Sequence, residues 1–339
     1  MRAIWITRHG GPEVLQVRET PDPTPGKGQV RIKVHAAGLN FAEMMARQGL
    51  YPDAPKPPCV VGYEASGVVD ALGEGVSGPA VGTKVIALSR FGAHTDSLVV
   101  PAGQVLPMPE GMSFEEGAAL PVVYLTAYHM LFRVGWLRPG AKVLVHMAAG
   151  GVGLAALQLC RTVPGVVTFG TASASKHEVI KQHGCDHPID YRSIDYAGEV
   201  RRLTNGQGVD LILDALGGED WKKGYGLLAP AGMLVAFGFA NMASGETRNL
   251  LHVVSNFFKV PKYSPMKLMD DNRGVAGVNV GHLWDHQDLL VGELKSLLAL
   301  YEQKKIKPVI DSTYKFEQAA EAQRRMSERK NVGKIVLVP

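Results

Sequence analysis

Two hydrophobic patterns divide the chain. Up to about residue 120, short runs of alternating apolar and polar residues, such as 29–35, stand between frequent glycines and prolines. Runs of this kind predict an antiparallel, barrel-like β domain. From about residue 123 the apolar runs alternate between strand-like and helix-like spacing, which predicts a parallel sheet with helices on both faces.

The second pattern predicts a regular succession of elements. The expected strands are 142–146, 166–170, 187–190, 209–214 and 233–238, and the expected helices are 152–161, 176–183, 195–204 and 221–228. The rhythm fails between about 241 and 272, and it resumes with a strand at 275–280, a helix at 289–304 and a last strand at 331–338. We therefore expect an α/β fold in which both chain ends, residues 1–122 and 292–339, form a β-rich domain around an inserted cofactor domain, residues 123–291.

A glycine-rich turn lies where the first strand of this second pattern meets a helix. Residues 146–153 read His-Met-Ala-Ala-Gly-Gly-Val-Gly, so Ala148, Gly150 and Gly153 have the spacing of the dinucleotide motif G-x-G-x-x-G, with alanine first. Small residues let the backbone approach a pyrophosphate, and the next helix offers free N–H groups to it. Close packing of helix on strand also selects glycine, so a structural explanation of the turn stays open.

The region that distinguishes NAD from NADP lacks an acidic residue. NAD-binding domains place a carboxylate about 20 residues beyond the glycines, on the ribose 2′-hydroxyl, whereas residues 168–176 here read TFGTASASK. Ser173 and Lys176 suit a 2′-phosphate, because the hydroxyl donates to it and the ammonium neutralises its charge. Ser175 to Glu178 also fits a capping box, which would begin a helix whatever bound nearby. The missing acid favours NADPH over NADH.

Composition and charge limit the partners of the protein. The chain has 339 residues, of which 46% are hydrophobic and 20% charged, and a net charge of +4 is spread along it. These values are typical of a globular protein of two domains and indicate no nucleic-acid partner. Three cysteines without a CxxC pair predict neither a disulfide framework nor a zinc cluster. We find no signal peptide and no membrane-spanning run, so we expect a cytoplasmic protein without stable membrane insertion.

Several longer stretches are similar to one enzyme family. The β domain, the turn at 145–153 and the C-terminal Asn-Val-Gly-Lys at 331–334 resemble the medium-chain dehydrogenases/reductases. Within that family the chain looks like the zinc-free quinone oxidoreductase branch. It is most similar to the homologues of vesicle amine transport protein one, through residues 38–42, 45–51 and 169–177. The resemblance implies a GroES-like catalytic domain beside a Rossmann-type, doubly wound parallel sheet.

The resemblance also implies that no metal is bound. Zinc-dependent members place a cysteine near residue 40 and a Gly-His-Glu after the next loop, whereas this chain has Asn40 and Gly62-Tyr63-Glu64 there. A catalytic zinc needs three protein ligands, and of that set only Glu64 is left. Oxidation of simple alcohols is therefore not expected.

The implied reaction is hydride delivery from NADPH to a small electron-poor acceptor. A quinone or an α,β-unsaturated carbonyl compound delocalises the incoming charge onto oxygen, where hydrogen-bond donors can stabilise it. By resemblance Asn40 lies beside the nicotinamide and the acceptor. Tyr51 is the first candidate for proton delivery and Tyr63 the second, with water as an open alternative. Asn40 also suits the N-cap of a helix at 41–48, and both tyrosines suit a core or an interface.

The same resemblance implies a set of cofactor contacts. Thr126 would bind the carboxamide, and Tyr191 would join Ser173 and Lys176 around the 2′-phosphate. The other expected contacts come from the glycine turn, the end of a later strand and the C-terminal strand: Ala148, Gly150, Gly151, Val152, Gly153, Phe237, Gly238, Phe239, Asn331, Gly333 and Lys334.

The family further implies a homodimer in which the strand near 275–280 pairs with its copy. The apolar segment 256–269 would then cover the substrate pocket or pack in the dimer. A function of a different class stays open, namely an NADPH-binding adaptor or membrane-associated regulatory protein with little turnover.

Overall fold

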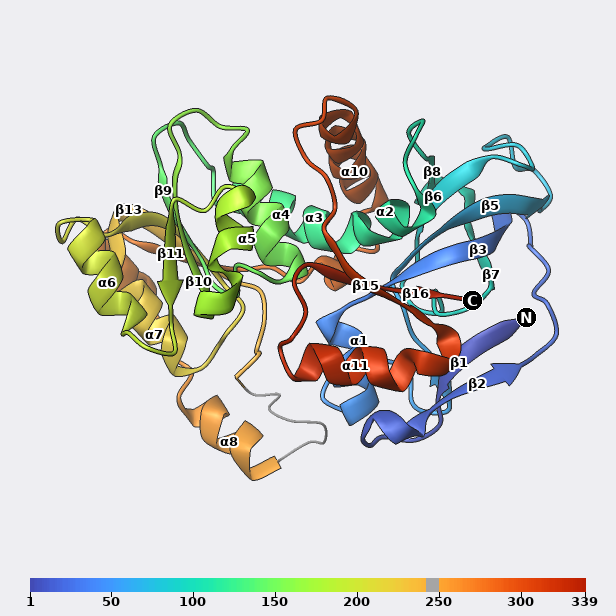
Figure 1. Ribbon diagram of the computed structural model, residues 1–339, viewed down its shortest axis with the longest axis horizontal. Coiled ribbons are helices and arrows are strands. Elements are labelled where there is room, and N and C mark those ends of the chain that lie inside the picture. Colours follow the sequence, from blue (N-terminus) through green and yellow to red (C-terminus); the bar gives the residue numbers. More distant parts are fainter. Residues whose placement is uncertain (242–249) are drawn as a thin grey trace.

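The computed structural model describes residues 1–241 and 250–339. Two units stand on either side of a central group of helices, and both labelled chain ends lie in the β-rich unit (Figure 1). Residues 242–249, which belong to the segment where the sequence pattern failed, lie outside the described residues. None of the helices in the described ranges is long and apolar enough to cross a bilayer.

The cofactor unit is built on a six-stranded parallel sheet. Its strands are β9 (Lys142–Val145), β10 (Val167–Ala172), β11 (His187–Asp190), β12 (Val209–Asp214), β13 (Leu228–Ala236) and β14 (Gly274–Gly277). They are arranged in the order β11-β10-β9-β12-β13-β14. This is the 3-2-1-4-5-6 order of a doubly wound dinucleotide-binding sheet, in which ligands bind where the order reverses, here between β9 and β12.

The first five of these strands are connected by α4 (Gly151–Cys160), α5 (His177–Gln182), α6 (Tyr196–Leu203) and α7 (Glu219–Tyr225). The predicted parallel sheet with intervening helices is confirmed, with slightly different element bounds. Val143, Leu144 and Val145 of β9 are all buried, as expected for a strand covered on both faces. The strand expected at 275–280 is wrong in its second half, because β14 ends at Gly277 and residues 280–282 form a 3₁₀ turn.

The β-rich unit combines strands from both ends of the chain. A three-stranded sheet contains β2 (Leu15–Glu19), β1 (Arg2–Ile6) and β4 (Cys59–Val60). A larger sheet has the order β15-β16-β3-β5-β6-β8, and β7 (Ser97–Pro101) also pairs with β3. Its other bounds are β15 (Ile310–Lys315), β16 (Lys334–Val338), β3 (Gln29–Leu39), β5 (Glu64–Leu72), β6 (Lys84–Leu88) and β8 (Val105–Pro107).

One strand pair departs from the predicted antiparallel pattern. β15 and β16 run parallel, because the chain returns between them through helix α11 (Ala319–Ser327). Parallel neighbours need such a crossover, whereas the other pairs of this unit are antiparallel.

The helices between the units position the site. α2 (Phe114–Ala119) leads into α3 (Pro121–Tyr128), which continues as a π-helical turn, His129–Val134. Helix α10 (Gln287–Glu302) packs against α3. The domain boundary expected between residues 291 and 292 would fall inside α10. Its position stays a prediction. Helix α1 (Phe41–Gln48) follows β3 and has the expected bounds.

Candidate cofactor and acceptor site

A cleft of about 1320 Å³ runs between the two units. One small-molecule ligand usually occupies roughly 300–1,000 Å³, so this cleft is large enough for a cofactor and an acceptor. All but one of the predicted site residues line it: Asn40, Tyr51, Tyr63, Thr126, Gly150, Gly151, Val152, Gly153, Ser173, Lys176, Tyr191, Phe237, Gly238, Phe239, Asn331, Gly333 and Lys334. Ala148 is fully buried behind the turn and does not reach the cleft.

The glycine turn has a left-handed residue that is not a glycine. Met147, with φ of 51°, takes this backbone conformation, which few residues other than glycine adopt. Gly150 then forms the N-cap of α4. A Cβ at Gly153 would lie 2.5 Å from the carbonyl oxygen of Met147, so only glycine lets α4 pack this closely on the end of β9.

Alanine at the first motif position has a structural explanation. Ala148 is completely buried, and a Cβ at Gly170 of the neighbouring β10 would come within 3.0 Å of the Ala148 Cβ. The glycine on β10 thus leaves room for the Ala148 methyl group.

The β-rich unit also contacts the turn. The N–H of Gly333 donates to the carbonyl of Ala149 at 2.8 Å, and Gly333 forms an isolated parallel bridge with Gly150. Gly333 has a φ of 84°, and a Cβ there would lie 2.3 Å from the Val309 carbonyl oxygen. The chain just before β16 therefore closes one side of the cleft.

A basic corner of the cleft contains Ser173, Lys176 and Tyr191. The Lys176 Nζ donates to the backbone carbonyls of Arg329 and Asn331, both at 2.7 Å, and burial lowers the pKa of Lys176 from its ordinary value. Sequence reasoning missed a second cation there, Arg192, which also lines the cleft. Its guanidinium carbon lies 6.0 Å from the centre of the Tyr191 ring. A basic residue directly after Tyr191 was the available signal.

The capping box expected at Ser175 to Glu178 is wrong. The chain enters α5 through a 3₁₀ turn, Ala174–Lys176, so Ser175 lies inside that turn. Glu178 instead pairs with Lys181 at 2.9 Å.

A buried polar cluster forms around Asn40 and Glu64, two of the positions at which the resemblance places the metal ligands of zinc-dependent members. The Asn40 Nδ2 donates to Glu43 at 3.2 Å and to Glu64 at 3.1 Å. The Lys334 Nζ lies 2.5 Å from Glu64 and donates to the Asn40 Oδ1. The second oxygen of Glu64 accepts the backbone N–H of Val122 at 2.7 Å. Both donors and the oxygen of the Asn40 amide are therefore in use.

These residues do not fit a zinc ion. An amide and a phenol replace two of the three ligands, and the ammonium of Lys334 already neutralises Glu64. Among the residues that the structure describes, no group of three His, Cys, Asp or Glu side chains could hold a metal.

Glu43 is a functional candidate that sequence reasoning missed. It is fully buried, and burial raises the pKa of its carboxyl to about 7 despite the opposing influence of Lys334 and Asn40. Its Oε2 accepts the backbone N–H of Asn40 at 2.7 Å, at the start of α1. Asn40 thus lies at the N-cap, as one interpretation held, and it also lines the cleft.

The proton-donor candidates differ in their surroundings. Tyr51 lines the cleft, and a Cβ at Gly281 would lie 3.0 Å from its hydroxyl. Tyr63 is 6% exposed, its hydroxyl has no hydrogen bond of normal geometry within the described ranges, and burial raises its pKa well above the usual value. The Thr126 hydroxyl donates to the Val122 carbonyl at 2.7 Å, so its lone pairs are what it can offer to a ligand.

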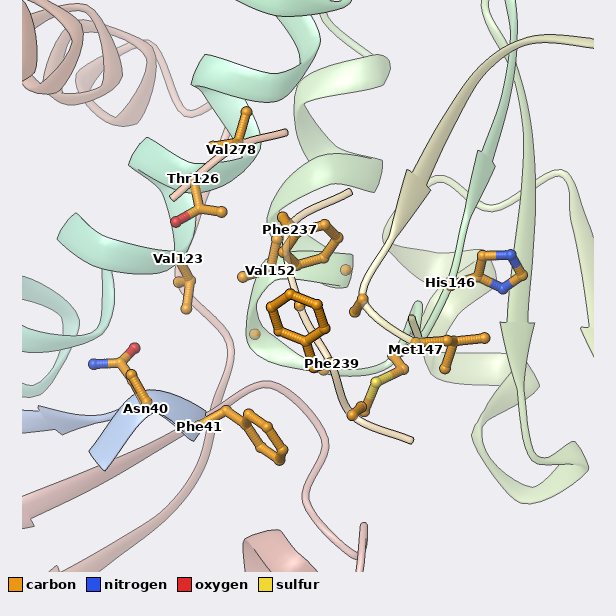
Figure 2. Close-up of a pocket in the computed structure, with 18 of the residues that line it drawn as sticks. Asn40, Phe41, Val123, Thr126, His146, Met147, Val152, Phe237, Phe239 and Val278 are labelled. Carbon is orange, nitrogen blue, oxygen red and sulfur yellow. The ribbon is translucent and has the colours of Figure 1, made fainter. Parts of the chain in front are cut away.

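The end of the cleft near Phe41 and Val123 is largely apolar. Figure 2 shows Asn40 and Phe41 at the lower left, Val123, Thr126 and Val278 at the upper left, and Phe237 and Phe239 next to each other in the middle of the view. His146 lies apart from this group, beside the parallel sheet. An apolar chamber with a few polar groups suits a small, largely apolar ligand.

Comparisons with known proteins agree with this architecture. The family model of the alcohol dehydrogenase GroES-like domain matches residues 26–110, and that of the zinc-binding dehydrogenase matches residues 183–337. The synaptic vesicle membrane protein VAT-1 homolog of Rattus norvegicus is 49% identical, covering 100% of this chain and 84% of the relative. The solved human VAT-1 homolog-like protein is 39% identical with a TM-score of 0.87, covering 100% and 98% of the two chains.

A further solved structure, Escherichia coli quinone oxidoreductase complexed with NADPH, is 27% identical with a TM-score of 0.88 over the full length of both chains. The second family is named for zinc binding, but the side chains of this chain at the implied zinc site do not form a set of zinc ligands. Identity of 49% along the whole chain, together with both family matches, shows that the chain belongs to the medium-chain dehydrogenase/reductase family, among the relatives of VAT-1.

Proposed function

We propose that the protein binds NADPH in this cleft and uses it to reduce a quinone or an α,β-unsaturated carbonyl compound without a metal. One observation carries the proposal: the cleft is continuous from the glycine turn and its basic corner to an apolar end. NADPH, when bound, supplies a hydride. The NADPH complex of the Escherichia coli quinone oxidoreductase, which shares the fold throughout, supports this choice of cofactor.

The residues divide the work of binding. The N-terminus of α4 at Gly151 would hold the pyrophosphate with its free N–H groups. Ser173, Lys176, Tyr191 and Arg192 would surround the 2′-phosphate. Further along, Thr126 would accept a hydrogen bond from the carboxamide and so select the exposed face of the nicotinamide.

Asn40 would not donate a hydrogen bond to the substrate. Its amide is held by Glu43, Glu64 and Lys334, so its role is to fix the wall of the chamber. Tyr51, which lines the cleft, is the candidate for proton delivery that the sequence suggested, and Tyr63 would stand behind it.

The test is loss of the absorbance of reduced nicotinamide. Purified, chelator-treated protein is mixed with a panel of quinones and enones, and NADH is run beside NADPH. We expect turnover with NADPH well above that with NADH. Saturable NADPH binding without turnover on any acceptor would contradict the reductase proposal.

The alternative is an NADPH-binding adaptor or membrane-associated regulatory protein. The names of the relatives, which are synaptic vesicle membrane proteins, favour it. It predicts cofactor binding with little turnover, so the same assay separates the two functions. For either function we propose a cytoplasmic homodimer.

A further inference from the structure

His129 lines the cleft and is held by a buried carboxylate. Its Nδ1 lies 3.0 Å and 3.2 Å from the two carboxylate oxygens of Glu293 on α10. The Glu293 side chain is only 3% exposed, and the Nε of Arg133 approaches it at 3.4 Å. A carboxylate accepts hydrogen bonds, so this geometry favours the tautomer in which Nδ1 carries the ring hydrogen and donates it to Glu293. Within the described ranges the other ring nitrogen, Nε2, has no hydrogen-bond partner.

The backbone at His129 is unusual. α3 ends at Tyr128, and His129 begins the π-helical turn. π-Helical turns are rare and occur frequently at functional sites. Side chains three residues apart on a helix have Cβ atoms about 5–6 Å apart. His129 therefore adjoins Thr126, and both line the cleft.

A histidine that lines a cleft, is oriented by a carboxylate and has no partner for its second nitrogen among the described residues has the arrangement of a proton-transfer group. We propose that His129, held by Glu293, binds the oxygen of the acceptor and, in place of Tyr51, supplies the proton for its reduction. The ligand class is a carbonyl compound and the phenol or enol formed from it. This inference rests on the proposed function for its chemical step, but not for its binding step.

The step balances with NADPH as the reductant. A quinone takes two electrons and one hydrogen from the reduced nicotinamide as hydride, and one proton from Nε2 of the protonated His129. The products are the hydroquinone, NADP⁺ and neutral His129, which regains a proton from water. Glu293 does not touch the acceptor, so it is a positioning residue.

The competing explanation is that His129 and Glu293 merely tie α10 to α3. A second hydrogen bond of α10 provides the control. The Tyr301 hydroxyl donates to Glu116 of α2 at 2.7 Å, and Tyr301 does not line the cleft. Tyr301→Phe breaks this tie and leaves the histidine intact. His129→Asn retains an N–H for Glu293 but has no counterpart of Nε2.

Two measurements test the proposal on the full chain. The first is turnover of NADPH with 1,4-naphthoquinone, for which we expect H129N to lower kcat by about 10²-fold, the usual size of a proton-transfer contribution. The second is calorimetric binding of 1-naphthol to the NADP⁺-loaded protein, which H129N should weaken about tenfold by removing a hydrogen bond. NADPH affinity should be unchanged in H129N, and Y301F should match the wild type in both measurements.

Glu293 has its own readout. Glu293→Ala should weaken 1-naphthol binding as H129N does, whereas Glu293→Gln should restore it, because the amide oxygen still accepts the Nδ1 hydrogen. A purely structural tie would leave naphthol binding unchanged in both.

The outcomes separate this inference from the proposed function. If the wild type turns over no acceptor but H129N alone loses naphthol affinity, the reductase proposal fails and the His129 site stands. If the wild type binds no 1-naphthol, or if H129N and wild type bind it equally, His129 is not a ligand group. Turnover of H129N at the wild-type rate overturns its role as proton donor.

Discussion

Lys176 contacts both units, and it provides the test of cofactor choice. We expect Lys176→Ala to raise the Kd for NADPH by about 10- to 100-fold, since hydrogen bonds to charged groups contribute roughly 1.5–3 kcal/mol. The Kd for NADH should change little, because NADH lacks the 2′-phosphate. Calorimetric titration with NADPH and with NADH measures both dissociation constants and so gives their ratio in each variant.

The control for this variant is Lys181→Ala on α5, the helix that begins directly after Lys176. Lys181 pairs with exposed Glu178 and does not line the cleft, so both affinities should stay at the wild-type values. Lys176 also holds the carbonyls of Arg329 and Asn331. Equal losses for NADPH and NADH in Lys176→Ala would therefore show that this tie, and not a phosphate contact, is its function.

Glu43 makes stability depend on pH. The pKa of its carboxyl rises from 4.5 to about 7 on folding, so between these values the folded protein retains a proton that the unfolded chain has lost. This contribution to stability is present below about pH 4.5 and is lost as pH rises to 7. The charged and polar groups facing it are Lys334, Glu64 and Asn40.

Glu43→Gln removes this titration. The difference in unfolding free energy between the variant and the wild type should shift by about 2 kcal/mol in favour of the variant from pH 5 to pH 8. This shift does not depend on the size of the difference at pH 5. Urea unfolding across this range measures the change. As a control, Glu110→Gln at an exposed position should show the same dependence of unfolding free energy on pH as the wild type. The same dependence in Glu43→Gln would rule out the raised pKa of Glu43.

The contact of α4 with β9 depends on Gly153. A Cβ there would meet the backbone of Met147 and Ala148 at 2.5–2.6 Å, and backbone atoms cannot turn aside. We expect Gly153→Ala to cost roughly 1–3 kcal/mol of unfolding free energy and to weaken NADPH binding.

Gly292 is the matched position. It lies inside α10, where an added Cβ would meet no other atom within 4 Å, so Gly292→Ala should stabilise the protein by about 0.5–1 kcal/mol through helix propensity. Urea unfolding of the two variants should move in opposite directions. A neutral Gly153→Ala would mean that the turn adjusts more easily than its backbone contacts indicate.

Elements that a pattern of neighbouring residues determines could be predicted from the sequence. Elements that depend on contacts between residues far apart in the sequence could not. The strands and helices of the cofactor unit and the glycine turn follow from spacing within a few residues. The parallel pair β15–β16 depends on a crossover, and the π-helical turn at His129 has no pattern of its own. The site shows the same limit: His129 and Glu293 are 164 residues apart, and Asn40 and Lys334 are 294 apart. Neither pair carries a motif, because folding alone brings them together.

At the scale of the whole molecule, an open sheet edge and an apolar ridge predict a dimer. β14 is the last strand of the six-stranded sheet and pairs with β13 on one side. We define the apolar ridge as Phe257, Phe258, Met266 and Met269, on α8 (Leu250–Phe258) and α9 (Pro265–Asp271), which are 68–83% exposed. α8 stands away from the six-stranded sheet (Figure 1). Exposed edges and large apolar patches usually have a partner.

We expect a particle of about 73 kDa, twice the chain mass of 36.5 kDa, by light scattering at micromolar concentration. Met266→Glu with Met269→Glu should shift it toward the monomer, because two buried charges would face each other across the interface. Trp136→Glu, at an exposed aromatic outside the ridge, should leave the mass unchanged. A monomeric wild type would leave the ridge free for another partner, and such a surface is what an adaptor, more than a reductase, requires.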